Sequence, residues 1–131
     1  MLLCGGAAEL CGTLTKGGSG TTSSFDRLPL WVCILIVFRA GIVEELFYRG
    51  YAIERLRAMG AGRFASPALP LFLFAVAHYA GAWVNVFQPL VLGGILTGFF
   101  LWRRDLVANI IAHTLVDLVG TGLLVRIVKS V

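Results

Sequence analysis

Two adjacent carboxylates, Glu44 and Glu45, directly follow an apolar stretch, residues 28–43, whose only charge is Arg39. A charged side chain inside a bilayer costs roughly 3 kcal/mol on insertion scales, so acidic residues are rare there unless they do chemistry. Glu45 and Arg49 are four residues apart, a spacing that on a helix permits an ion pair. Glu44 points about 100° away and lacks that counter-charge. We therefore predict that Glu44 acts as a general base, while Glu45 and Arg49 support the site structurally.

Three further ionisable residues lie in stretches that carry almost no charge. His78 lies within residues 64–102, which contain no Asp, Glu, Lys or Arg, and His113 and Asp117 are the only ionisable members of residues 106–125. Each feature has a simpler interpretation: the glutamate pair as a helix end at the membrane interface, His78 as a core residue bonded to a carbonyl, and the other two as a polar contact between helices. Because three helices would each bring an ionisable group to mid-membrane depth, we favour one shared site.

Two mechanisms of peptide hydrolysis fit these side chains. In the first, Glu44 and His78 hold and deprotonate a water, while His113 and Asp117 stabilise the oxyanion that develops on the carbonyl. In the second, His78, His113 and Glu44 bind Zn²⁺, which makes a bound water nucleophilic at neutral pH. The sequence has no HExxH motif, so no local spacing supports a zinc site. We favour the glutamate-activated water and keep Zn²⁺ as the alternative cofactor.

The composition predicts an integral membrane protein. Of the 131 residues, 58% are hydrophobic and 14% charged, whereas soluble domains are about 25% charged. One bilayer crossing needs about 20 apolar residues, so the uncharged run over residues 64–102 is long enough for two. The net charge of +4 could indicate nucleic-acid binding, but the basic residues are scattered at expected helix ends and form no dense patch. We expect the lipid bilayer as a partner and no nucleic acid.

The apolar segments predict an all-α fold, an integral membrane bundle of about four transmembrane helices. We expect these helices over about residues 28–57, 66–79, 87–102 and 106–125. Residues 1–27 are rich in Gly, Ser and Thr and predict a flexible polar lead, followed by one core domain over residues 28–131. The first and third turns share one side and carry five basic residues, which slightly favours the cytoplasm on that side.

Three motifs, in this order on successive apolar helices, resemble those of the CPBP family of intramembrane proteases, which contains the type II CAAX prenyl endopeptidases and the bacteriocin-processing and immunity proteins. The motifs are Glu44-Glu45-x-x-x-Arg49, Phe74-x-x-x-His78 and His113-x-x-x-Asp117. The resemblance covers about residues 28–128 and implies that Glu44 activates the water together with His78. It further implies that His113 and Asp117 form the pair on the oxyanion side. Because an ionised aspartate cannot donate, Asp117 must be protonated for that role or must instead orient His113.

The expected function is therefore an intramembrane endopeptidase. Its substrate would be a peptide or protein entering from the membrane, and the resemblance implies a prenylated CAAX or leader-bearing one. We expect the protein in the cell (plasma) membrane of a prokaryote. Two other classes stay open. A non-catalytic immunity or scaffold protein would keep its phenotype in Glu44→Gln, and a small ion- or proton-relay protein would show pH-dependent ion flux without cleavage. The oligomeric state is left open.

Overall fold

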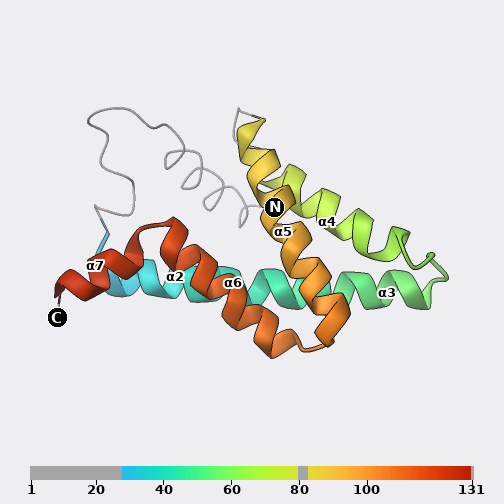
Figure 1. Cartoon of the computed structure of the whole chain (residues 1–131), viewed down its shortest axis with the longest axis horizontal. Helices are drawn as coiled ribbons and strands as arrows, with labels where there is room; N and C mark the ends of the chain where they lie inside the picture. Colours follow the sequence, from blue (N-terminus) through green and yellow to red (C-terminus); the bar gives the residue numbers. More distant parts are fainter. Residues whose placement is uncertain (1–27, 80–82, 131) are drawn as a thin grey trace.

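The computed structural model of the chain describes residues 28–79 and 83–130, and every element within this part is a helix (Figure 1). The elements are α2 (Leu30–Glu44), η2 (Glu45–Ala52), α3 (Ile53–Ala58), α4 (Ala65–Ala77), α5 (Val84–Arg103), α6 (Leu106–Gly120) and α7 (Leu123–Ser130). The all-α class predicted from the sequence is confirmed. The polar lead predicted for residues 1–27 lies outside the described residues.

The first three elements follow one another without a break and form one long rod over residues 30–58, which runs across the lower half of Figure 1 from cyan to green. The rod begins at Pro29, whose carbonyl accepts hydrogen bonds from the amides of Val32 and Cys33. This matches the first helix expected from the apolar pattern. Its middle part, η2, is a π-helix, with hydrogen bonds from each residue to the fifth one along, and the sequence pattern did not predict it.

The π-helix explains how the rod keeps one straight buried stripe. The buried residues of the rod are spaced by four and are Cys33, Val37, Gly41, Glu45, Arg49 and Ile53. In an α-helix, four residues turn about 40° beyond a full circle, so such a stripe would wind around the rod. A π-helix is wider and turns by less than a full circle over four residues. The π segment therefore turns the stripe back, so that Glu45 faces α6, as α2 does, while Arg49 reaches α4 and α5.

The second and third expected helices correspond to α4 and α5, which pack against each other. The sequence predicts the reversal over the stretch that holds Gly81, Asn85 and the Gln88–Pro89 pair, with a helix from about residue 87, and this helix start is too late. The carbonyl of Trp83 already accepts from the amides of Val86 and Phe87, so α5 begins at Val84 and Pro89 lies inside it. A proline this close to a helix start removes only one hydrogen bond, which the rest of the long helix offsets.

The expected helix over residues 106–125 is broken into α6 and α7, whose axes differ by 77°. The Asp105 side chain caps the start of α6 by accepting from the amide of Ala108 at 3.0 Å. At the other end, the Thr121 hydroxyl donates to the Asp117 carbonyl, and Gly122 has a φ of 71°, a conformation that favours glycine and ends the helix. The prediction of one unbroken helix over residues 106–125 is therefore wrong.

Judged by length and composition, fewer helices could cross a membrane than the four predicted from the sequence. Within the described part of the chain, one helix, Asn85–Arg103, is long and apolar enough to cross a membrane, and α6 with α7 would count as a second only as a bent pair. α4 is a shorter apolar helix. The four-span bundle is thus not confirmed. Large apolar side chains are exposed along the rod, among them Trp31, Leu35 and Phe38, as on surfaces that face a membrane or a partner.

Candidate active site

Glu45 is a buried carboxylate that accepts hydrogen bonds from three side chains. Its side chain is fully buried, and Oε1 accepts from Arg49 Nη1 at 2.9 Å and from His113 Nδ1 at 2.8 Å. Its other oxygen, Oε2, accepts from Asn109 Nδ2. The ion pair with Arg49 is the one that the four-residue spacing predicts. Three donors compensate the loss of water around this carboxylate, which would otherwise be very costly to bury.

Arg49 ties the π-helical part of the rod to α4 and α5. Besides its bond to Glu45, it donates from Nη2 to the Gly93 carbonyl at 3.0 Å and from Nε to Thr97 Oγ1 at 3.3 Å, both on α5. Its guanidinium also lies 4.8 Å from the centre of the Phe74 ring on α4. A buried arginine that directs three donors at fixed acceptors holds its neighbours in one arrangement.

The hydrogen bond to Glu45 fixes the orientation of His113. A carboxylate can only accept, so His113 Nδ1 carries a proton, and the other ring nitrogen, Nε2, is turned away from Glu45. Nε2 lies 3.6 Å from Asp117 Oδ2 and 3.8 Å from Glu44 Oε2. These distances are within ion-pair range but longer than direct hydrogen bonds. His113 therefore lies between one carboxylate that orients it and two that approach its reactive nitrogen.

His78 has its tautomer fixed in the same way. Its Nδ1 lies 2.7 Å from the Phe74 carbonyl, which can only accept, so Nδ1 is the protonated nitrogen. The structure thus contains the carbonyl hydrogen bond that the simpler interpretation of His78 expects. The side chain is nevertheless only partly buried and lines a cavity, so its Nε2 remains for a molecule that enters there.

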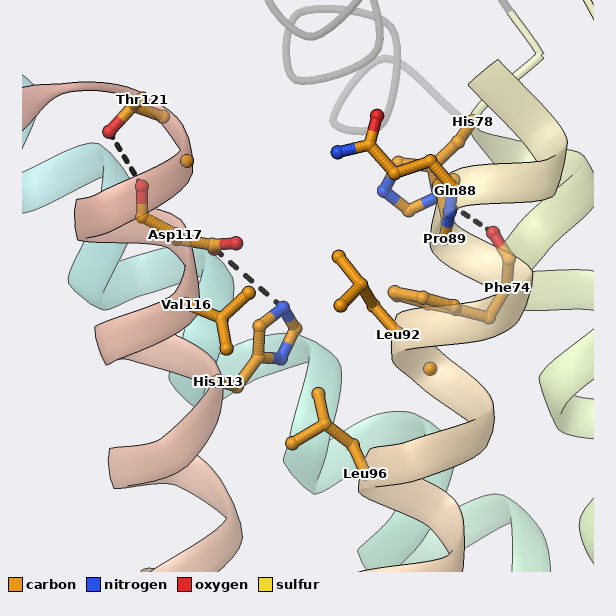
Figure 2. A pocket seen from close by; sticks show the side chains of 12 residues that line it. Phe74, His78, Gln88, Pro89, Leu92, Leu96, His113, Val116, Asp117 and Thr121 are labelled. Carbon is orange, nitrogen blue, oxygen red and sulfur yellow. Dashed lines mark hydrogen bonds and ion pairs between the residues drawn. The ribbon is translucent and has the colours of Figure 1, made fainter. Parts of the chain in front are cut away.

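A cavity of about 200 Å³ lies between α4 and α5 on one side and α6 on the other. Figure 2 shows His113 and Asp117 on α6 facing His78 and Gln88 across it, with Leu92 of α5 between them and Leu96 below His113. The structure therefore brings three of the four predicted catalytic residues to one cavity. The fourth, Glu44, does not line it but lies beside His113 Nε2, with 23% of its side chain exposed.

Sequence reasoning missed Asn109, Thr97 and Gln88. Asn109 is buried and lies four residues before His113 on the same helix, so a polar residue at that spacing in an uncharged segment was the available signal. Thr97 lies in α5 among apolar residues and meets Arg49 only through the tertiary fold, which spacing along the chain does not reveal. Gln88 was interpreted as part of a turn, whereas it lies on α5 and lines the cavity.

The zinc alternative lacks a matching set of ligands. Among the described residues, no three His, Cys, Asp or Glu side chains are arranged so that they could hold a metal ion. Each histidine keeps its Nε2 for a further partner, because Nδ1 is bonded to Glu45 in His113 and to the Phe74 carbonyl in His78, an arrangement that metal-binding histidines also have. The predicted set of His78, His113 and Glu44 is nevertheless not arranged as a metal site among the described residues, and the mechanism below uses the protein's own side chains.

Comparison with known proteins identifies the family. The model of the family described as Type II CAAX prenyl endopeptidase Rce1-like matches residues 26–119, which include all three motifs and all four predicted catalytic residues. Neither the curated proteins nor the solved structures gave a match. Because the family match covers well over half of the chain, this protein belongs to the Rce1-like type II CAAX prenyl endopeptidases, a membrane-embedded family of proteases.

Proposed function

We propose that the chain is an intramembrane endopeptidase that hydrolyses a peptide bond through a water activated by Glu44 and His78. The observation that carries this proposal is the convergence of His78, His113 and Asp117 on one cavity, with Glu44 next to His113. General base catalysis needs an acceptor within reach of the water, and both a carboxylate and a neutral imidazole nitrogen serve. His78 offers Nε2 for this purpose because its Nδ1 is bonded to the Phe74 carbonyl.

The reaction follows from these positions. Glu44 takes a proton from the water, whose oxygen attacks the substrate carbonyl carbon and forms a tetrahedral intermediate with a negative oxygen. His113, when its ring carries both protons, donates from Nε2 to that oxygen. The intermediate collapses, the carbon–nitrogen bond breaks, and the proton held by Glu44 passes to the leaving amine. Each step uses a group that the structure places at or beside the cavity.

Asp117 fits an orienting role better than a donating one. Its Oδ2 lies 3.6 Å from His113 Nε2, so as a carboxylate it attracts the doubly protonated ring. It would donate to an oxyanion only after taking up a proton. In the proposed mechanism Asp117 therefore keeps the charged ring of His113 close to the cavity, and His113 makes the contact with the substrate oxygen.

The proposed substrate is a membrane-associated peptide or protein that enters from the bilayer. The family name points to a prenylated CAAX sequence, and a leader-bearing peptide is the second substrate class. The apolar wall from Pro89, Leu92, Leu96 and Val116 suits a peptide with aliphatic side chains better than a charged one. We further propose that the protein acts in the plasma membrane of a prokaryote.

The first test is a cleavage assay on purified protein in detergent, with a prenylated CAAX peptide and a panel of leader peptides. We expect Glu44→Gln to slow cleavage by roughly 10²- to 10⁴-fold, the range typical for loss of a general base. Glu54→Gln is the matched control, since Glu54 lies further along the same rod and pairs with Arg57 and Arg104 at the surface. Mass spectrometry of products formed in ¹⁸O-labelled water identifies the new carboxyl group.

The outcomes separate the classes of function. Cleavage that is lost in Glu44→Gln, kept in Glu54→Gln and unaffected by a chelator supports the proposed mechanism. Loss of cleavage with the chelator would point to a metal at the histidines instead. If the wild-type protein cleaves no substrate, an immunity or scaffold protein becomes the better interpretation. Ion flux in proteoliposomes without cleavage would indicate the relay class.

A further inference from the structure

Asn109 is a buried polar residue that the mechanism above does not use. Its side chain is completely shielded from solvent on α6, four residues before His113. Its Nδ2 donates to Glu45 Oε2, while its Oδ1 has no hydrogen-bond partner among the described residues. A buried amide oxygen without a partner is unfavourable, and a leucine of similar size would avoid that cost. The residue is therefore poorly explained by packing alone.

The amide orientation of Asn109 is determined by its neighbour. A carboxylate has no proton to donate when it is ionised, so only the NH₂ group of Asn109 can face Glu45. In the described part of the chain, Asn109 is the one donor recorded for Oε2, whereas Oε1 receives both Arg49 and His113. Asn109 thus donates to Oε2, the oxygen that Arg49 and His113 do not contact.

This contact decides how the carboxylate of Glu45 is turned. Arginine and carboxylate groups prefer two parallel hydrogen bonds, one to each oxygen. With Oε2 unoccupied, Glu45 can rotate to offer both oxygens to Arg49, which takes Oε1 away from His113 Nδ1. With Asn109 on Oε2, the carboxylate stays in the plane in which Oε1 reaches His113 at 2.8 Å. Asn109 therefore acts on His113 through Glu45.

We infer that Asn109 is a positioning residue, which holds Glu45 so that Glu45 keeps His113 protonated at Nδ1 with Nε2 directed toward the cavity. Its effect on catalysis rests on the proposed function, but its effect on the ring of His113 does not. Residues that orient a catalytic or ligating histidine through a second group typically change activity by 10- to 100-fold when they are replaced.

The kinetic test compares Asn109→Leu and Asn109→Asp with the wild-type protein. Leucine removes the donor at similar size, and aspartate keeps the shape but places a second acceptor against Glu45. We expect kcat to fall roughly 10- to 100-fold with KM changed by less than about 3-fold, because the substrate contacts stay in place. Ser66→Ala is the matched control, since Ser66 is fully buried and donates to the Gly62 carbonyl away from the cavity.

A second readout does not depend on activity. The chain contains two histidines, so ¹⁵N labelling of histidine gives signals from His78 and His113 only, provided that the purification tag has none. His78→Gln assigns them. We expect both rings to be protonated at Nδ1 in the wild-type protein. In each Asn109 variant, the His113 nitrogen shifts should move toward a mixture of the two tautomers, while those of His78 stay unchanged.

The two readouts separate the failure of this inference from that of the proposed function. If the wild-type protein cleaves and the Asn109 variants change neither kcat nor the His113 signals, Asn109 is not a positioning residue. The same conclusion follows if Ser66→Ala lowers kcat equally, because the loss is then structural. If no substrate is cleaved but the His113 signals respond to Asn109→Leu, the proposed function is overturned and the positioning role is supported. Where Asn109→Leu does not fold, Asn109→Asp decides.

Discussion

Glu44 and Glu45 are neighbours in the chain, yet they have opposite environments. Glu45 is fully buried and accepts from three donors, whereas Glu44 keeps 23% of its side chain exposed and approaches only His113 at ion-pair distance. One step along a helix turns the side chain by about 100°, which is enough to place one carboxylate inside and the other at the edge of the site. In the proposed mechanism, Glu45 therefore supports the site and the neighbouring Glu44 activates the water.

This division predicts different effects on stability. Glu45→Ala leaves the charge of Arg49 buried without its counter-charge, and such a loss typically costs about 3–5 kcal/mol of unfolding free energy. Glu44→Ala breaks no direct hydrogen bond recorded in the structure, so we expect a cost below about 1 kcal/mol. Unfolding of both variants with sodium dodecyl sulfate in mixed micelles measures the difference. Equal destabilisation by the two substitutions would contradict the assigned roles.

At the scale of elements, the rod and α6 approach closely where the rod carries Gly41. A Cβ atom at this position would overlap Thr114 Oγ1 of α6, so a glycine is needed for the two helices to pack. Small residues of this kind let membrane helices come into close contact. Gly41 lies one turn before Glu45 and Thr114 directly follows His113, so this close contact lies next to the hydrogen bond between Glu45 and His113.

Gly41→Ala should destabilise the protein by about 1–3 kcal/mol, because the added methyl group overpacks this contact. The double variant Gly41→Ala/Thr114→Ala should regain part of that loss, since it removes the overlapping hydroxyl. Gly98→Ala on α5 serves as the control, as its added Cβ meets nothing within 4 Å. The same unfolding measurement applies. A double variant no more stable than Gly41→Ala would place the strain elsewhere.

At the scale of the whole molecule, the end of the rod meets the turn between α5 and α6. Glu54 Oε1 lies 2.9 Å from Arg104 Nη1 in this turn and 3.2 Å from Arg57 Nη1. The end of the rod, with Arg55 and Arg57, and the turn with Arg103 and Arg104 are thus neighbours in space. At the opposite end of the rod, α7 meets the residues before α2, and Arg126 donates to the Leu28 carbonyl at 2.9 Å.

This arrangement predicts which positions share one side of a membrane. Gly62→Cys and Arg103→Cys, in a background without the three native cysteines, should react with a membrane-impermeant maleimide from the same side of oriented vesicles. Ser130→Cys should react from the opposite side. The positive charges favour the cytoplasm for the first pair. Labelling of Gly62→Cys and Arg103→Cys from different sides would contradict the observed fold as the membrane-inserted one.

The sequence was sufficient for features that depend on residues close together in the chain. The four-residue spacing predicts the pair of Glu45 and Arg49, and the apolar runs predict helices where they occur. The start of α5 was mispredicted because Pro89 was taken as a local turn signal, although it lies inside the helix. The break after Gly120 was missed because Gly122 was not taken as the end of a helix. The role of Asn109 could not be predicted, since its partner Glu45 lies 64 positions away.

The hydrogen bonds of Arg49 link the position of α5, which shapes the cavity, to the orientation of His113. α5 supplies both the apolar wall of the cavity and the acceptors Gly93 and Thr97 that hold Arg49. An outward movement of α5 that widens the cavity would break these bonds. The freed guanidinium of Arg49 would then draw Glu45 away from His113. A bulky substrate that forces α5 outward would therefore disrupt the contact between Glu45 and His113. In the proposed mechanism, a substrate is therefore cleaved only if it fits the cavity while α5 keeps its hydrogen bonds to Arg49.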